Sequence, residues 1–315
     1  MQLFPNVYEI SSEFGGRWLK QYLLRGQDKV LLLDTGVITT PETVIFPYLE
    51  KLGLSPRNIT MAIALHVDGD HHGGLPAVKN ASAGTLLGCG RADVALIEDP
   101  DVCYAKRMNF LAEKHGLGFG REVMVYSPEG RKIDAPFSGG ETIRLSPDWE
   151  IEVWHVPGHS EGHLAIYDRK NRAAFTSDAV QSNGYPTVNG GVAFGPTYYE
   201  VNAYLNTVHL LESKPIDHMF GGHWPGMHGD SVRKFLASTR AFVERTDELL
   251  TAYLRDHRRG ATLKQIILDL SPKLGPWPQD MALILQFAMY GHLARMEQGG
   301  KIRRSTTIPV TYAVA

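Results

Sequence analysis

Three segments of the chain combine histidine with glycine, and each directly follows a short apolar run. They read HVDGDHHGG at residues 66–74, VPGHSEGH at 156–163 and GGHWPGMHG at 221–229. Side chains that follow the ends of strands in a layered sheet gather along one edge, where ligands usually bind. The chain is therefore constrained to a sheet whose strand ends bring these three segments together.

The pattern around these segments predicts short buried strands that alternate with helices. Apolar, β-branched runs bounded by glycine predict strands at residues 29–34, 59–66, 84–88, 150–156, 163–168, 172–177 and 217–221. Helices are predicted at residues 41–52, 75–80, 91–98 and 199–212. Strands interleaved with helices indicate a layered α/β fold.

From Asp230 onward the apolar residues recur at helical spacing, which predicts one long amphipathic helix. Further helices are predicted at residues 263–270 and 281–297, and the tail KIRRSTTIPVTYAV predicts a short hairpin. We therefore expect residues 1–229 to form the main domain and residues 230–315 a helical, winged-helix-like accessory region. Basic and acidic residues are mixed in that region, so we expect it to pack against the domain or cover a pocket rather than bind nucleic acid.

The composition excludes several classes of partner. The chain has 315 residues with a formal net charge of −2, which argues against a nucleic-acid surface or a polybasic membrane anchor. No apolar run reaches the length that crosses a bilayer, and MQLFPNVYEI lacks the pattern of a secretory signal. Cys89 and Cys103 form at most one bridge. We expect a cytoplasmic protein that acts on a small molecule, with a homodimer compatible with the sequence.

Four predicted strand ends carry residue types that bind metals. The candidate ligands are His66, Asp68, Asp70, His71, His159, Asp178 and His223. These seven are more than one ion needs, and imidazole with carboxylate suits Zn²⁺, Mn²⁺ or Fe²⁺. Taken singly, each residue is better explained as a polar strand end or a helix cap than as a ligand. Four strand ends together favour a metal site.

At this point the sequence resembles the metallo-β-lactamase superfamily. HVDGDHHGG resembles its signature H-x-H-x-D-H-x-G-G, except that Asp68 stands at the second histidine. VPGHSEGH resembles the motif P-G-H-T-x-G-H, and GGHWPGMHG resembles the last ligand loop. LLLDTG resembles the strand whose aspartate, here Asp34, supports the metal site from behind, and FTSDAV resembles the segment with the bridging aspartate, here Asp178. The resemblance covers roughly residues 7–229.

The resemblance implies an αββα sandwich that holds two adjacent divalent metal ions. It places His66, Asp68 and His159 at the first ion. It places Asp70, His71 and His223 at the second ion, with Asp178 bridging both. A bridging hydroxide would attack an ester, lactone, thioester or related bond, with Asp70 and Asp178 as the catalytic carboxylates. His72 is not a ligand in this scheme.

Asp68 changes the expected charge of such a centre. Two divalent ions, one hydroxide and three carboxylates are formally neutral, whereas the usual two carboxylates leave one positive charge. Extra carboxylate favours iron or manganese relative to zinc. Some superfamily members with a carboxylate here are di-iron proteins that act on oxygen, so a di-iron oxygen-activating enzyme is an alternative. Hydrolysis is favoured because it is the commoner activity of the fold and needs no electron donor.

A second alternative is a serine α/β-hydrolase. GHSEG at residues 158–162 matches the G-x-S-x-G nucleophile elbow with Ser160, and Asp178 and His223 follow in Ser–Asp–His order. An elbow leads directly into a helix, whereas HLAIYDRKN alternates apolar and polar residues and predicts a strand. A catalytically silent binding protein is disfavoured, because three buried carboxylates without a counter-ion are costly.

Substrate contacts are expected from loops next to the ligands. Tyr185 lies in QSNGYP after Asp178, and Trp224 adjoins His223. Tyr104, with Cys103, Met108 and Phe110, is a candidate apolar lid. For each of these residues, ordinary packing is an equally good interpretation. A pocket built from them would suit a small, fairly hydrophobic substrate.

Overall fold

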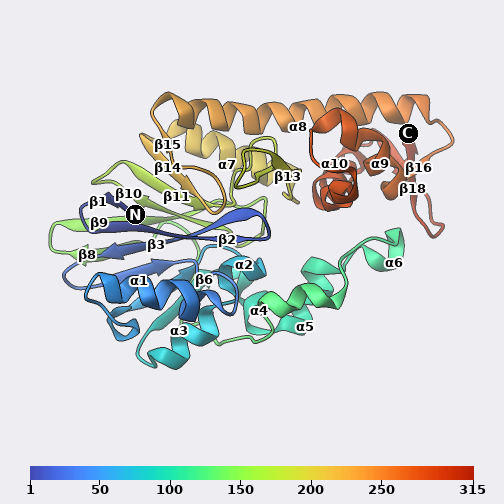
Figure 1. The fold of residues 1–315 in the computed structure, drawn as a ribbon. Coiled ribbons are helices and arrows are strands. Elements are labelled where there is room, and N and C mark those ends of the chain that lie inside the picture. Colours follow the sequence, from blue (N-terminus) through green and yellow to red (C-terminus); the bar gives the residue numbers. More distant parts are fainter.

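The computed structural model describes residues 1–315, and its central feature is a pair of β-sheets packed face to face (Figure 1). The first sheet has seven strands in sequence order. They are β1 (Gln2–Phe4), β2 (Val7–Phe14), β3 (Arg17–Arg25), β4 (Val30–Leu33), β5 (Met61–Ala64), β6 (Leu86–Gly90) and β7 (Ala135–Phe137). Strands β1 to β4 are antiparallel, and β4 to β7 are parallel.

The second sheet has six strands in the order β15-β14-β11-β10-β9-β8. They are β8 (Thr142–Ser146), β9 (Trp149–His155), β10 (Leu164–Asp168), β11 (Ala173–Ser177), β14 (His218–Gly221) and β15 (Met227–His228). Only the β11–β14 pair is parallel. A small hairpin, β12 (Tyr185–Pro186) and β13 (Val192–Phe194), follows β11.

The main core lies between the two sheets. Leu31 and Ile63 of the first sheet pack there with Ile151, Ile166 and Phe175 of the second. Strands β4 and β5 are buried on both faces, because helices cover the side that does not face the second sheet. This explains why VLLL and MAIA are continuous apolar runs rather than alternating ones.

Helices cover the outer face of each sheet, which gives four layers (Figure 1). On the first sheet lie the turns and helices η1 (Pro41–Ile45), α1 (Phe46–Lys51), η2 (Pro56–Asn58), α2 (Gly69–His72), α3 (Leu75–Ala81), η3 (Arg91–Asp93) and α4 (Val94–Glu98). Helices α7 (Val201–Ser213) and α8 (Asp230–Asp256) cover the second sheet. The expected αββα sandwich is therefore confirmed.

The segment that joins α4 to β7 consists of short turns. They are α5 (Pro100–Cys103), η4 (Tyr104–Met108), α6 (Ala112–His115) and η5 (Arg121–Tyr126). Figure 1 shows this segment extending from the first helical layer beneath the C-terminal helices.

The C-terminal region is helical, as expected, and carries a small sheet. Helix α8 runs along the second sheet and then past α9 (Leu263–Leu274), η6 (Gln279–Leu285) and α10 (Gln286–Gln298), as Figure 1 shows. Strands β16 (Ala261–Thr262), β17 (Ile302–Arg304) and β18 (Thr311–Val314) form an antiparallel sheet in the order β16-β18-β17. One continuous core joins this region to Tyr198 and Tyr204, which precede and begin α7. None of the helices is both long and apolar enough to cross a membrane.

The predicted strands and helices lie within a few residues of the observed ones, but the N-terminal strands were missed. Strands β2 and β3 form a hairpin with the turn residues Gly15 and Gly16, both at positive φ. Such a two-residue turn requires positive φ at both positions, which glycine adopts without strain.

Candidate metal centre

Five strand ends supply the side chains of the candidate centre, and all of them lie at one edge of the sandwich. Asp34 follows β4, and the segment from His66 to His71 follows β5. His159, Asp178 and His223 follow β9, β11 and β14. Six of the seven predicted ligands form two groups, His66 with Asp68 and His159, and Asp70 with His71 and His223. The rings of His66 and His71, with centres 4.1 Å apart, bring the two groups together, and Asp178 lies beside the second group.

The first group has two buried histidines that present free nitrogen atoms to one carboxylate. His159 Nε2 lies 2.9 Å from Asp68 Oδ2, and His66 Nε2 lies 3.9 Å from the same oxygen. His66 Nε2 is buried without a hydrogen-bond partner, and the only polar side chain close to His159 Nε2 is that of Asp68. Burial and the neighbouring histidines hold the pKa of His66 well below its usual value, so this ring is neutral and can donate a lone pair.

The second group has two imidazole rings whose Nε2 atoms point toward each other. His71 Nε2 lies 3.1 Å from His223 Nε2, and His223 Nε2 lies 3.5 Å from Asp70 Oδ2. Nitrogen ligands about 2.0–2.1 Å from one tetrahedral ion stand about 3.4 Å apart, close to the spacing of these two atoms. The group therefore has the dimensions of a metal site.

Asp178 lies beside the second group. Its Oδ2 lies 3.4 Å from His223 Nε2, and its Oδ1 lies 3.8 Å from His71 Nε2. Oδ1 is buried without a hydrogen-bond partner, whereas Oδ2 accepts a hydrogen bond of 2.9 Å from the Tyr185 hydroxyl. Burial alone would raise the pKa of Asp178, but His223 and His71 lower it. Asp178 is therefore a buried carboxylate that needs positive charge beside it.

Asp34 fixes the orientation of the His71 ring through a hydrogen bond to its Nδ1. Its Oδ2 accepts hydrogen bonds from His71 Nδ1 at 2.8 Å and from the Ser177 hydroxyl at 2.7 Å. A proton on Nδ1 leaves Nε2 free to bind a metal. Asp34 and Ser177 both have positive φ, 58° and 45°, although neither is glycine. Such strained backbone is found mainly where a functional site requires it.

The electrostatics of the site also fit a cation. Burial alone would lower the pKa of His71, but Asp70, Asp178 and Asp34 together raise it to about 10. A histidine with this pKa is protonated at neutral pH, and its proton supplies positive charge beside the surrounding carboxylates. The unpartnered Nε2 atom of His66, the free Asp178 oxygen and this negative potential together fit divalent metal ions.

Arg107 is the main feature that sequence reasoning missed. It lies in η4 and is 7% exposed. Its Nε and Nη2 donate to the two oxygens of Asp68 at 3.1 and 3.3 Å, and its Nη1 donates to the His159 carbonyl oxygen at 2.8 Å. Although burial acts in the opposite direction, Arg107 and His159 hold the pKa of Asp68 well below its usual value. The expectation of a formally neutral centre left out this charge.

Residues from the loops after β11 and β13 hold His159. Gln181 Nε2 donates to its Nδ1 at 2.9 Å, and the Thr197 hydroxyl lies 3.3 Å from the same nitrogen. His163, which ends the second histidine segment, stacks on His66 with ring centres 4.7 Å apart. The only sequence signal for these positions was their proximity to a predicted ligand.

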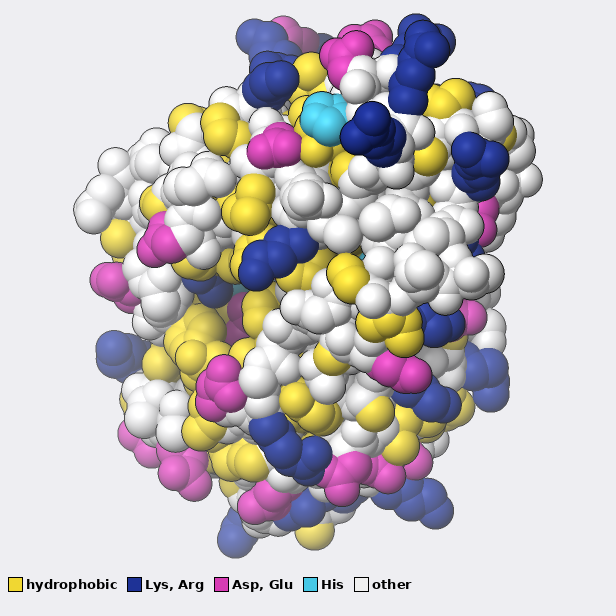
Figure 2. Space-filling view, turned by 90° about the vertical axis from the view of Figure 1, so that its right-hand side faces the viewer, with side chains coloured by type: hydrophobic (Ala, Val, Ile, Leu, Met, Phe, Trp, Pro, Cys, Tyr) yellow, Lys and Arg dark blue, Asp and Glu magenta, His cyan; other side chains and the backbone are white.

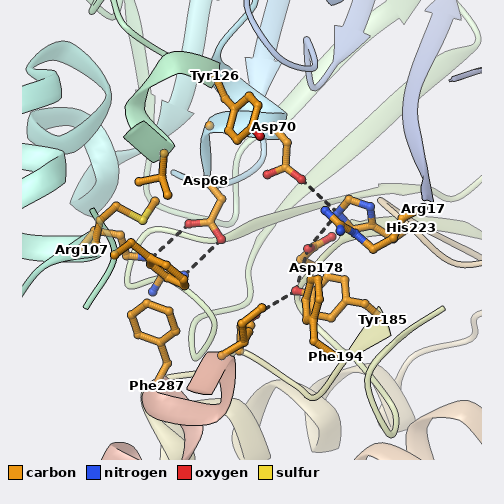
Figure 3. Close-up of a pocket in the computed structure, with 16 residues that line it drawn as sticks. Arg17, Asp68, Asp70, Arg107, Tyr126, Asp178, Tyr185, Phe194, His223 and Phe287 are labelled. Atoms are coloured by element: carbon orange, nitrogen blue, oxygen red, sulfur yellow. Dashed lines mark hydrogen bonds and ion pairs between the residues drawn. The ribbon is translucent and has the colours of Figure 1, made fainter. Parts of the chain in front are cut away.

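Several of the candidate ligands line a pocket, which Figure 3 shows in close-up. Asp68, Asp70, Asp178 and His223 line its floor. Its apolar wall consists of Met108, Phe119, Val123, Ile284 and Phe287. In the space-filling view of Figure 2, hydrophobic side chains gather around a hollow on this side of the molecule. The pocket therefore combines the polar candidate metal site with apolar side chains.

Of the three predicted substrate contacts, the structure places one in the pocket. Tyr185 lines it beside Asp178. The prediction was wrong for Trp224, which is 5% exposed, packs behind Tyr185 and donates to the Gly184 carbonyl oxygen. It was also wrong for Tyr104, which packs in the first helical layer. Neighbouring positions in the sequence do not share a side-chain direction, and this accounts for both errors.

The structure contradicts the serine-hydrolase alternative. The Ser160 hydroxyl donates to Asp93 Oδ2 at 2.6 Å, and no histidine contacts it. Asp93 Oδ1 accepts from the Gly162 backbone N–H at 2.8 Å. The chain then enters strand β10 rather than a helix. Ser160 therefore lacks a base and lies in a turn rather than in a nucleophile elbow.

Comparisons with known proteins agree with this geometry. Two curated relatives are named acyl-coenzyme A thioesterase MBLAC2. The chicken protein (Gallus gallus) is 30% identical over 195 residues, which are 56% of this chain and 64% of that protein, so the chain spans less than two thirds of its length. The human protein (Homo sapiens) is 25% identical over 245 residues, which are 70% of this chain and 79% of that one.

A solved structure extends the similarity to the whole fold. A metallo-beta-lactamase family protein from Thermus thermophilus superimposes with a TM-score of 0.79 at 19% identity, and the match covers 99% of this chain and 100% of that one. The family model described as the Metallo-beta-lactamase superfamily matches residues 20–223. This span begins in β3 and ends at the last candidate ligand, His223. The chain therefore belongs to the metallo-beta-lactamase superfamily.

Proposed function

We propose that this hydrolase of the metallo-β-lactamase superfamily cleaves the thioester of a small acyl compound at a two-metal centre. The observation that carries the proposal is the pair of adjacent ligand groups, with the buried carboxylate of Asp178 beside them, in a partly apolar pocket. The chemistry of the substrate is suggested by the curated relatives, which are named acyl-coenzyme A thioesterases.

The proposed ligands follow the two groups. His66, Asp68 and His159 hold the first ion. Asp70, His71 and His223 hold the second, and Asp178 contacts both. Support comes from the unpartnered Nε2 atom of His66 in the first group and the spacing of the facing rings in the second. Zinc, iron and manganese all suit this mixture of imidazole and carboxylate.

When bound, such ions supply a Lewis acid for the carbonyl oxygen and lower the pKa of water. Asp70 and Asp178 orient the attacking water from the pocket floor, and one of the two carboxylates receives its proton. The proton then passes to the departing sulfur, so that water and thioester become carboxylic acid and thiol. The wall formed by Met108, Phe119 and Phe287 excludes bulk water from the acyl group.

Tyr185 is proposed to position Asp178. Its hydroxyl donates to Asp178 Oδ2, and burial raises its pKa well above the usual value, so it remains a donor. Thr197 and Gln181 contact the same hydroxyl at 2.9 Å each. A fixed donor of this kind keeps one carboxylate oxygen away from the ions and leaves Oδ1 free.

We also propose that residues 1–229 form the catalytic domain and that residues 230–315 form an accessory region that completes the pocket. Ile284 of η6 and Phe287 of α10 line the pocket, and the Phe287 ring lies 5.3 Å from the Arg107 guanidinium. The accessory region would then determine which acyl groups fit, in keeping with a covering role rather than nucleic-acid binding.

Metal removal tests the proposal directly. Protein purified without added metal is expected to contain about two divalent ions per chain, and a chelator is expected to lower thioesterase activity by at least ~100-fold. Elemental analysis and the hydrolysis rate of an acyl-coenzyme A measure the two effects, and readdition of the removed metal should restore the rate. A metal-free protein of full activity would contradict the proposal. Two irons per chain with oxygen consumption and no hydrolysis would favour the oxygen-activating alternative suggested by Asp68.

Ser160→Ala separates the metal mechanism from a serine mechanism. We expect unchanged thioesterase activity, because the Ser160 hydroxyl contacts Asp93 and no ligand. We also expect a loss of about 1–3 kcal/mol in the free energy of unfolding, because buried Asp93 loses a hydrogen-bond donor. Urea denaturation and initial rates measure the two effects. A loss of activity in a folded variant would contradict the assignment.

A further inference from the structure

Arg17 lies in the same pocket as the candidate ligands and has no acidic partner. It begins strand β3 and lines the pocket with Asp178, Tyr185 and His223. Its Nε is buried without a hydrogen-bond partner, and it forms no ion pair. Its one hydrogen bond, from Nη1 to the Gly15 carbonyl oxygen, is long at 3.4 Å. A partly buried guanidinium with an unused donor requires an acceptor that the protein itself does not supply.

The other arginine of the pocket is fully occupied. Arg107 uses both edges of its guanidinium on Asp68 and on the His159 carbonyl oxygen. Figure 3 draws Arg17 beside His223, on the opposite side of the pocket from Arg107 and Phe287. Arg17 is therefore the one permanently charged cation of the pocket lining that is free to bind a ligand.

The position of Arg17 is fixed by its surroundings. Its guanidinium carbon lies 4.8 Å from the centre of the Phe194 ring, over which it stacks. The adjacent carbonyl oxygen of Trp18 accepts a hydrogen bond of 2.7 Å from His223 Nδ1. The carbonyl oxygen of Gly16, at the hairpin turn, accepts from the Val188 backbone N–H at 2.9 Å. The hairpin that carries Arg17 is therefore held against the metal site and the β12–β13 loop.

We propose that Arg17 binds an anionic group of the substrate, a carboxylate or a phosphate, near the scissile bond. This inference rests on the proposed thioesterase function and adds the charge of the substrate to it. The planar guanidinium matches the two oxygens of such a group, and stacking on Phe194 leaves its edge free. The anion belongs either to the acyl part or to the leaving thiol, and the geometry requires it on the side of His223, opposite the apolar wall.

Two matched pairs of thioesters test this proposal and locate the anion. Adipoyl and hexanoyl thioesters of N-acetylcysteamine differ by a carboxylate on the acyl part. Hexanoyl thioesters of N-acetylcysteine and N-acetylcysteamine differ by a carboxylate on the leaving thiol. In whichever pair carries its carboxylate on the part of the substrate that Arg17 binds, Arg17→Met is expected to raise KM for the charged member by about 10- to 100-fold. KM for the neutral member is expected to stay within about twofold. Arg17→Lys should retain part of the preference.

Arg25→Met is the matched control, because Arg25 ends the same strand and lies outside the pocket. It should leave both pairs unchanged. If Arg17→Met weakens charged and neutral members by the same factor, or affects neither pair, Arg17 does not bind a substrate anion. Circular dichroism and the melting temperature establish that each variant is folded, and Arg17→Gln serves as a second neutral variant.

A binding measurement separates this proposal from the thioesterase proposal. Calorimetric titration with two ligand pairs, adipamate against hexanamide and N-acetylcysteine against N-acetylcysteamine, needs no turnover, and in each pair only the first member carries a carboxylate. The wild type is expected to bind adipamate or N-acetylcysteine more tightly than its neutral counterpart, and Arg17→Met is expected to lose that difference. If the wild type cleaves no thioester but this difference is present, the thioesterase proposal fails and the anion site stands. If thioesters are cleaved but the difference is absent, the anion site fails alone.

Discussion

Replacing Asp178 by asparagine is expected to lower kcat/KM by about three orders of magnitude. The carboxylate lies beside the candidate ligands His71 and His223, and its Oδ1 is buried with no partner in the protein. The amide has nearly the same shape but no charge, so it binds a cation weakly. Metal ions contribute several kcal/mol to the stabilisation of such transition states, and each 1.36 kcal/mol corresponds to a factor of ten.

The same variant has a second expected effect that does not depend on activity. Bound metal stabilises the folded protein, so the melting temperature of metal-loaded protein exceeds that of stripped protein. In Asp178→Asn this difference should shrink, and elemental analysis should find less than the wild-type metal content. Asp217→Asn is the control, because Asp217 is exposed, pairs with Arg172 and lies just before β14, away from the site. Wild-type metal content and activity in Asp178→Asn would show that Asp178 is not a metal ligand.

The layered fold could be predicted because its central strands leave a strong local pattern. Strands β4, β5, β10 and β11 are buried on both faces, so they appear as continuous apolar runs. Strands β2 and β3 leave no such pattern. Strand β3 reads RWLKQYLLR and buries Lys20, which pairs with Glu9 on the neighbouring strand. A polar residue buried by a cross-strand partner looks exposed in the sequence.

The candidate ligands could be predicted because each stands just after a strand, within a short motif. Their supporting contacts could not. Arg107 and Asp68 are 39 positions apart, and Arg107 lies among short helical turns that have no clear periodicity. The sequence did signal that Asp68 was unusual. What it could not supply was the counter-charge, because the choice of partner depends on how the segment after α4 folds back over the site.

Removing Arg107 is expected to have the largest effect on stability. Arg107→Met leaves the Asp68 carboxylate with only His159 beside it, and breaking a largely buried ion pair in this way costs about 2–4 kcal/mol in the free energy of unfolding. Urea denaturation of metal-free protein measures the loss. Lys106→Met is the matched control, because this exposed neighbour carries the same charge without contacting Asp68. Equal stability of the two variants would show that the pair is dispensable.

The pair also determines how Asp68→His should behave. The substitution restores the histidine of the superfamily signature, but in this chain it leaves the buried Arg107 cation without an acidic partner beside the proposed metal site. Asp68→His alone is therefore expected to lose stability and metal. The double variant Asp68→His with Arg107→Met removes both charges. Its loss in the free energy of unfolding should therefore be smaller than the sum of the two single losses, by about 0.5–3 kcal/mol.

Metal preference provides the second readout of this double variant. A site with histidine in place of the carboxylate has one hard oxygen ligand fewer, so its preference should move toward zinc relative to iron and manganese. Competition between zinc and manganese, measured by elemental analysis after dialysis, tests this shift. If the stabilities of the two single variants simply add and the preference does not change, Asp68 and Arg107 act independently, and Asp68 binds no metal. If they couple, the aspartate and the arginine act as one unit: together they replace a neutral histidine without changing the net charge of the centre.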